Sequence, residues 1–159
     1  MPAKNALDYH DYYVQQIMND WKSFTEFVFS NQYSEFDFSE AKAKMEMPLV
    51  PKQVGQKFVS IKGYIDIFVT GVMAKPANSE DHFWSRLDYP IEVKSHIKSI
   101  TETMRQINTH RAYMRPGVDY VLASPDNRFI DLLESQDVNY IELEKTNLEP
   151  NNPDVDSLL

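Results

Sequence analysis

Glu92 and Lys94 lie two positions apart in an apolar, β-branched stretch, residues 89–95 (YPIEVKS). Successive side chains of a β-strand point to opposite faces, so these two charges share one face of the predicted strand. A carboxylate inside an apolar strand costs several kcal/mol unless it is paired or takes up a proton. The two residues are therefore either an ion pair on an edge strand or part of a site that uses both charges.

A second carboxylate, Asp66, lies in another apolar stretch with strand character, residues 64–69 (YIDIFV). If the two strands are neighbours, Asp66 and Glu92 can meet at one end of a sheet, where a divalent cation would offset their repulsion. Two carboxylates, a main-chain carbonyl and water are ligands that Mg²⁺ accepts. Lys94 could then hold an attacking water or stabilise the charge that develops on phosphorus during hydrolysis. The alternative is that Asp66 is a polar residue near a turn.

The first half of the chain contains elements that could support these strands. Apolar residues at helical spacing predict one helix over about residues 7–29, and residues 39–45 (SEAKAKM) predict a short helix. Residues 57–74 are rich in Val, Ile, Phe and Thr, which predicts one or two strands. Residues 75–88 are polar and predict a turn-rich connection to the next strand.

The second half of the chain alternates between helical and strand patterns. The predicted elements are a helix over 96–114, a strand over 118–124, a helix over 125–136 that begins at Pro125 and Asp126, and a strand over 138–144. Because helices and strands alternate, we expect an α/β domain with a central sheet.

The composition limits the classes of protein. The 159 residues suffice for one compact domain, which we expect over 1–144, with a disordered acidic tail over 145–159. The chain has no cysteine, which excludes disulfides, thiolate metal sites and cysteine nucleophiles. No stretch has the length of a membrane helix and the first residues lack a signal peptide's apolar region. We therefore expect a soluble, intracellular, cytoplasmic protein that does not bind membranes.

Charge is unevenly distributed along the chain. The formal net charge of −8 argues against a protein that coats nucleic acid over its whole surface. Between residues 94 and 115, however, five Lys and Arg residues accompany a single Glu. Such a segment either binds a specific anionic partner or is a solvated helix face.

Taken together, these motifs resemble the PD-(D/E)XK nuclease superfamily, which includes type II restriction enzymes, archaeal Holliday junction resolvases and RecB-like exonucleases. Gly63 and Asp66 match the family's Gly-x-x-Asp, and Glu92 and Lys94 match its (D/E)-x-K. The resemblance covers about residues 57–144 and implies the restriction-endonuclease-like αβββαβ core, with a central mixed sheet flanked by helices. It implies that Asp66 and Glu92 hold Mg²⁺, which Mn²⁺ can replace, and that Lys94 is catalytic.

The resemblance also assigns residues outside these motifs. It implies the carbonyl of Val93 as a third metal ligand. RecB-like members carry a catalytic glutamine in the next helix, often followed four residues later by tyrosine, and Gln106 lies at a fitting distance. His110 stands where that tyrosine would fall and Tyr113 one turn later, which departs from the RecB-like pattern. Many members also use an acid from the first helix as a metal ligand. The candidates here are Glu26 first, and then Asp20 and Glu46.

The predicted helix over 96–114 has a polar stripe beside its apolar face: Ser99, Thr103, Gln106, His110 and Tyr113. Gln106 would orient water or the scissile phosphate near Glu92. We expect His110 to be hydrogen-bonded within the fold rather than a metal ligand. The predicted contacts to DNA are Lys98, Arg105, His110, Arg111 and Arg115.

The expected activity is Mg²⁺-dependent hydrolysis of DNA phosphodiester bonds, by an endonuclease rather than an exonuclease. Duplex, single-stranded and branched DNA all remain open as substrates. A chain of this size has no room for a separate recognition domain, so specific duplex cleavage would need a homodimer or higher oligomer. The alternatives are a catalytically silent DNA-binding or assembly module with the same fold, and an acidic protein-interaction domain. The last would leave the carboxylates in apolar strands unexplained.

Overall fold

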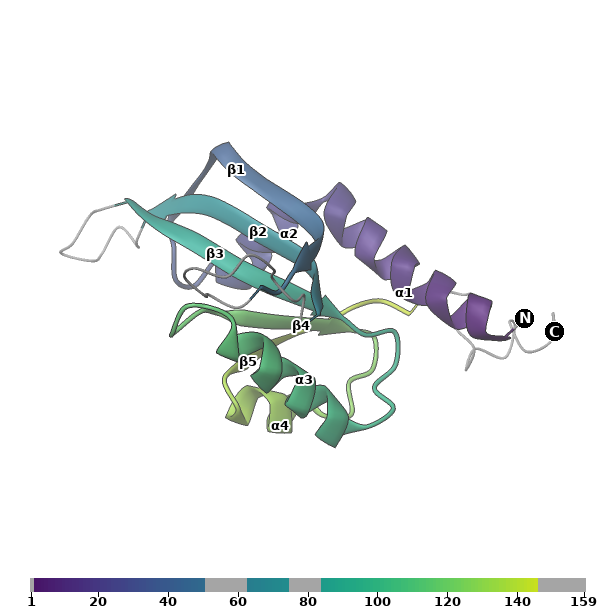
Figure 1. The fold of residues 1–159 in the computed structure, drawn as a ribbon. Coiled ribbons are helices and arrows are strands. Elements are labelled where there is room, and N and C mark those ends of the chain that lie inside the picture. Colours follow the sequence, from purple (N-terminus) through teal and green to yellow (C-terminus); the bar gives the residue numbers. More distant parts are fainter. Residues whose placement is uncertain (1, 51–62, 75–83, 146–159) are drawn as a thin grey trace, which may run out of the picture.

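In the part of the chain that the structure describes, five strands form one mixed sheet in the order β1-β2-β3-β4-β5 (Figure 1). The computed structural model describes residues 2–50, 63–74 and 84–145. The strands are β1 (Glu35–Pro48), β2 (Tyr64–Ala74), β3 (Trp84–Val93), β4 (Tyr120–Ser124) and β5 (Val138–Glu142). The pairs β1–β2 and β2–β3 are antiparallel, whereas β3–β4 and β4–β5 are parallel.

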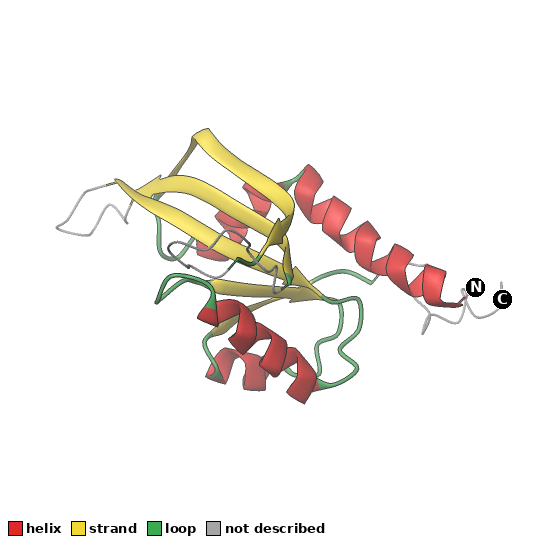
Figure 2. Ribbon diagram, in the orientation of Figure 1, coloured by secondary structure: helices red, strands yellow, loops and turns green. Residues whose placement is uncertain are grey.

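In the described ranges, four helices accompany the sheet (Figure 2). They are α1 (Pro2–Asn19), α2 (Trp21–Phe29), α3 (Ile100–Ala112) and α4 (Ile130–Ser135). The parallel strands β3 and β4 are joined through α3, and β4 and β5 through α4. The expected α/β class with a mixed central sheet is confirmed.

β2 lies between β1 and β3 and alternates buried with less buried residues. Ile65, Ile67 and Val69 are fully buried on one face of β2, whereas Asp66 and Phe68 are half-buried on the other. The predicted alternation of residues 64–69 is therefore confirmed. Residues 57–62, which were included in the strand prediction, lie outside the described residues.

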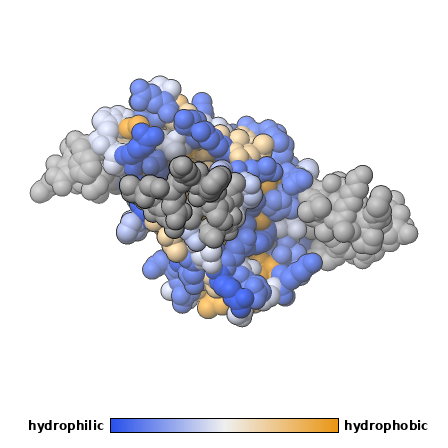
Figure 3. Space-filling view, viewed as in Figure 1, coloured by the Kyte–Doolittle hydropathy of each residue, from blue (hydrophilic) through white to orange (hydrophobic). Residues whose placement is uncertain are grey.

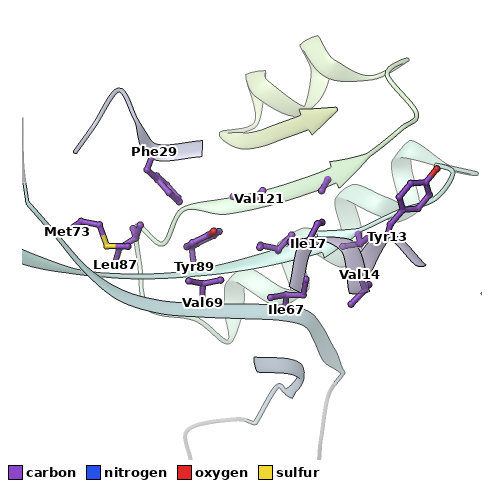
Figure 4. Close-up of a cluster of buried hydrophobic side chains, with 13 residues drawn as sticks. Tyr13, Val14, Ile17, Phe29, Ile67, Val69, Met73, Leu87, Tyr89 and Val121 are labelled. Atoms are coloured by element: carbon purple, nitrogen blue, oxygen red, sulfur yellow. The ribbon is translucent and has the colours of Figure 1, made fainter. Parts of the chain in front are cut away.

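One hydrophobic core lies between this buried face and the first two helices. Tyr13 and Ile17 of α1 and Phe29 of α2 pack with Ile67 and Tyr89 of the sheet (Figure 4). Phe29 and Tyr89 contact edge to face, with ring centroids 4.8 Å apart, and the Thr25 hydroxyl shares a 2.7 Å hydrogen bond with the Tyr89 hydroxyl. These contacts fix α1 and α2 against β2 and β3.

A second core lies on the opposite face and involves only the last part of the sheet. It contains Ile107 of α3, Leu133 of α4, and Tyr120, Leu122 and Tyr140 of β4 and β5. None of the buried residues in this core comes from β1 or β2. The same face of β1 and β2 is therefore not covered by any described helix.

Two predictions for the first half of the chain are wrong. The predicted helix over 7–29 is two helices, because Asp20 leaves the helical conformation (φ −138°, ψ 38°) and redirects α2 so that Thr25 and Phe29 reach Tyr89. Residues 39–45 lie within β1 rather than in a helix. Pairing with β2 and the alternation of half-buried alanines with exposed lysines outweigh the helical preference of Ala, Lys and Glu there.

Two predicted boundaries are also wrong. Residues 84–88, expected in a polar connection, belong to β3, because β2 supplies a hydrogen-bonding partner for each of them and Leu87 is buried. Residues 75–83 lie outside the described residues. The last helix begins at Ile130 rather than at Pro125 and Asp126, since the Asp126 carboxylate binds the loop before α3 instead. The expected tail over 145–159 falls almost wholly outside the described part of the chain.

The visible surface is mainly hydrophilic, with small separate hydrophobic areas (Figure 3). Among the described helices, none has the length and apolar character needed to cross a membrane.

Candidate functional site

The pairing of β2 with β3 brings Asp66 and Glu92 to adjacent positions on one face of the sheet. Ile67 pairs with Ile91, and Asp66 and Glu92 are the next residues of the two strands. Residues opposite each other in antiparallel strands have Cβ atoms about 5 Å apart, and like charges there are destabilising. The two carboxylates that the sequence singled out are thus neighbours where the β2–β3 ladder ends.

Asp66 is held as a carboxylate by two donors. Its Oδ2 accepts a hydrogen bond of 2.8 Å from the Val93 backbone N–H, and its Oδ1 lies 3.2 Å from His10 Nε2. Burial alone would raise the pKa of Asp66, but the hydrogen bonds from His10 and Val93 outweigh it and hold this pKa below its usual value. Asp66 is therefore the ionised member of the pair.

Glu92 is in the opposite situation, because its carboxyl group is buried with little compensation. Its side chain is only 5% exposed, and Oε2 has no hydrogen-bond partner among the described residues. Desolvation, and then the negative charge of Asp66, raise the pKa of Glu92 to about 8 against the opposing effect of Lys94. Lys94 Nζ lies 3.7 Å from Glu92 Oε1. The environment therefore separates the pKa values of two neighbouring carboxyl groups, which is frequent in active sites.

His10 of α1 is the residue of this site that the sequence analysis missed. Its imidazole is about one-third exposed, and the hydrogen bond and charge of Asp66 raise its pKa to about 9. His10 lies three positions before Tyr13, the first residue of the helical apolar stripe, so helical spacing places it next to the face that packs on the sheet. That spacing was the only feature of the sequence from which the position of His10 could have been predicted.

The residues that could hold a cation are Asp66, Glu92, the carbonyl of Val93 and, when its imidazole is neutral, His10. No group of three or more His, Asp and Glu side chains already converges as a ligand set in the part of the chain that the structure describes. The chemistry of the donors nevertheless fits a hard cation. Two adjacent carboxylates repel, and the buried Oε2 of Glu92 is an acceptor without a partner.

His110 and Tyr120 lie behind Glu92. His110 Nδ1 shares a 2.7 Å hydrogen bond with the Tyr120 hydroxyl and lies 3.8 Å from Glu92 Oε2, too far for a hydrogen bond. Burial, and then the charge of Lys94, lower the pKa of His110. His110 is thus buried and hydrogen-bonded within the fold, as predicted. Because it is buried, its side chain is not accessible to a phosphate. Gln106, one turn earlier in α3, is half-buried, and no hydrogen bond joins it to Glu92 or Lys94 within the described residues.

The three acids considered as first-helix ligands lie in different places. Glu26 is exposed on α2 and borders a surface depression with Ser30 and Glu35 rather than with Asp66. Asp20 is exposed at the junction of α1 and α2. Glu46 is exposed on β1, where the pairs Met45–Ile67 and Met47–Ile65 set it across from Asp66. The strand register thus brings only the last of the three acids near Asp66.

The predicted DNA-contacting residues are dispersed. Arg111 donates to the carbonyls of Gln136 and Asp137, at 3.0 and 2.7 Å, and so ties α3 to the turn before β5. Arg105 pairs with Glu102 on the exposed side of α3, at 3.1 Å. Lys98 and Arg115 are exposed before and after the helix, respectively.

The segment that follows Lys94 is held by a buried carboxylate. Asp126 Oδ2 accepts a hydrogen bond of 3.0 Å from Ile97 N–H, and Arg128 Nη2 donates to both Asp126 Oδ2 and the Ile97 carbonyl, each at 2.7 Å. The hydrogen bond from Arg128 is the main reason why the pKa of Asp126 is strongly lowered. Lys94 itself donates its backbone N–H to the Ala123 carbonyl at 3.0 Å. The position of Lys94 is therefore fixed on both sides.

No family model, curated protein or solved structure matches the chain. What the site does must therefore be inferred from its own geometry and chemistry.

Proposed function

We propose that the protein is a Mg²⁺-dependent deoxyribonuclease of the PD-(D/E)XK type. The observation that carries the proposal is the placement of Asp66 and Glu92 side by side at the end of the β2–β3 ladder, with Lys94 Nζ 3.7 Å from Glu92. Two carboxylates and a lysine on one sheet face serve poorly as a structural motif, because one carboxylate oxygen remains buried without a partner. They serve well as a cation site with a neighbouring ammonium group.

Each residue has a role that follows from its surroundings. Mg²⁺ bound by Asp66, Glu92 and the Val93 carbonyl would supply Lewis acidity toward a phosphate oxygen. Lys94 would orient the attacking water and stabilise the negative charge that grows on the phosphate oxygens as the water oxygen bonds to phosphorus. As the new bond forms, the attacking water gives up a proton to solvent; the bond from phosphorus to the leaving oxygen breaks, and this oxygen takes a proton from solvent. His10 keeps Asp66 ionised and oriented through its 3.2 Å contact.

The order of elements supports the same proposal. The described elements run α1, α2, β1, β2, β3, α3, β4, α4 and β5. If α1 and α2 are counted as one helical segment, the part from α1 to β4 is compatible with the αβββαβ order of the restriction-endonuclease-like core, and α4 and β5 are additional. Gly63 precedes β2 with φ +149°, a conformation that residues with a side chain rarely adopt, so the glycine of Gly-x-x-Asp has a backbone reason to be there. The alternative, a silent DNA-binding or assembly module, would keep this order without cleavage.

A cleavage assay tests the proposal. Wild type, Asp66→Ala and Lys94→Ala are incubated with duplex, single-stranded and branched DNA, in Mg²⁺ or Mn²⁺ and in chelator. Lys145→Ala is the matched control, because Lys145 is an exposed lysine after β5 to which no role in metal or DNA binding is assigned. We expect metal-dependent cleavage by wild type and Lys145→Ala, and a loss of 10²-fold or more, on the order of one catalytic group, in the other two variants. If wild type cuts none of these DNAs, the silent module is the better description.

A further inference from the structure

A depression of about 290 Å³ lies on the same side of the sheet as the carboxylate pair. Phe68 of β2 and Asp88 of β3 form its floor, and Tyr113, Met114 and Arg115, which follow α3, form part of its wall. It is thus lined mainly by apolar and aromatic side chains and has two charged groups within reach. None of these residues takes part in the carboxylate site.

The depression involves the same two strands as Asp66 and Glu92. Phe68 is two residues after Asp66 on the same face of β2, about 7 Å along the strand. Asp88 is four residues before Glu92 on the same face of β3. A base bound there could belong to the same strand as a phosphate held at the carboxylates, since Phe68 is about 7 Å from Asp66 along β2.

We propose that this depression binds one unstacked base of a single-stranded DNA segment, next to the phosphate that the carboxylates would hold. This inference rests on the proposed nuclease function and specifies its substrate. The rings of Phe68 and Tyr113 offer the flat apolar surfaces on which single-stranded bases stack. In an intact duplex the faces of each base are covered by its neighbours, so only an unstacked base could lie on these rings. Asp88 can accept a hydrogen bond from the exocyclic amine of cytosine, as acidic side chains do in base recognition.

The charges around the depression suit a nucleic-acid backbone. Lys42 and Lys44 are exposed on β1 and pair in register with Thr70 and Phe68, so they continue the same face. Arg115 is exposed at the rim, and among the described residues no backbone carbonyl binds its side chain as two bind Arg111. In a chain with a net charge of −8, three cations around one apolar depression confine a polyanion to this face.

The negative charge of Asp88 does not oppose this arrangement. Its Oδ1 lies 3.4 Å from Arg86 Nε, so the charge is partly balanced within β3. The carboxylate can therefore face a base without strongly repelling the neighbouring phosphates.

The test measures binding without cleavage. A short single-stranded DNA oligonucleotide containing one 2-aminopurine is titrated in EDTA, and fluorescence reports both affinity and stacking of that base. The variants are Phe68→Leu and Tyr113→Leu, which remove the rings but keep apolar volume, and Arg115→Gln. The matched control is Arg105→Gln, which makes the same charge change on the exposed side of α3.

We expect each ring variant to bind about 5- to 150-fold more weakly, the range observed for loss of one base-stacking contact, and to lose the 2-aminopurine signal. Arg115→Gln should bind more weakly than Arg105→Gln, and a blunt duplex of the same sequence more weakly than the single strand. Wild-type affinity and signal in both ring variants, or tighter binding of the duplex, would overturn the base site. An RNA oligonucleotide bound more tightly than the DNA would overturn the assignment to DNA. Because no cleavage is needed, this outcome is separate from that of the nuclease assay.

Discussion

Replacing Glu92 by Gln should make the metal-free protein more stable than wild type at high pH. In the unfolded chain this carboxyl group has a pKa of 4.5, whereas burial and Asp66 raise its pKa in the folded protein to about 8. Between these values the unfolded chain releases a proton that the folded protein retains. The wild-type free energy of unfolding therefore falls as pH rises from about 4.5 to about 8, and a glutamine has no such proton to lose.

The size of the effect follows from the same two values. The difference is about 3.5 pKa units, and each unit corresponds to about 1.4 kcal/mol, which gives a ceiling of about 5 kcal/mol. Relaxation and water entry lower such penalties in real proteins, so we expect about 2 kcal/mol. The stabilisation that protonated His10 contributes is also lost as pH rises from 6.5 through about 9. Because His10 is present in both wild type and Glu92→Gln, the comparison of these two proteins removes most of this contribution.

The assay is urea unfolding in EDTA at pH 5 and pH 8.5. The control is Glu26→Gln, the same substitution at an exposed glutamate of α2. Relative to wild type, Glu92→Gln should gain about 2 kcal/mol between pH 5 and pH 8.5, whereas Glu26→Gln should gain nothing. A difference between Glu92→Gln and wild type that does not change with pH would refute the reasoning about Glu92.

Two further predictions concern His10 and Asp126. The imidazole of His10 should titrate near pH 9 in NMR spectra recorded in EDTA, and its titration midpoint should fall toward pH 6.5 in Asp66→Asn. An unchanged midpoint would mean that the contact with Asp66 does not form. Asp126→Ala should lower the free energy of unfolding by about 2 kcal/mol at pH 7, because it removes charge-assisted hydrogen bonds such as the one from Arg128. The control Asp131→Ala, at an exposed position, should change the free energy of unfolding little. Because the pKa of Asp126 is lowered in the folded protein, its carboxylate stabilises the fold fully above about pH 4 and less as the pH falls further. Urea unfolding should therefore show a smaller loss of stability in Asp126→Ala at pH 3 than at pH 7.

The strands β2 to β5 and the carboxylate pair could be predicted because their signals are local. Period-two alternation places Asp66 opposite the buried face of β2, and the same rule places Glu92 of β3 and Lys94, the residue after β3, on the same side. Once the two strands pair as a hairpin, the register makes the carboxylates neighbours.

Features that depend on long-range packing were not visible in the sequence. Residues 39–45 have helical propensity, but β2 provides a ladder of hydrogen bonds that only the folded sheet can show. His10 reaches Asp66 because α1 docks on the sheet, and Arg111 is engaged by carbonyls of a distant turn. Basic residues that are close together in the sequence therefore have separate structural roles in the fold.

The central claim is that Asp66 and Glu92 together hold a divalent cation, and Mn²⁺ binding measured by electron paramagnetic resonance tests it most directly. The titration compares wild type, Asp66→Asn, Glu92→Gln and the exposed control Glu26→Gln at one pH. The account predicts saturable binding by wild type and by the control, and a large loss of affinity in the other two variants. Equal Mn²⁺ binding by all four proteins, or none by wild type, would contradict it.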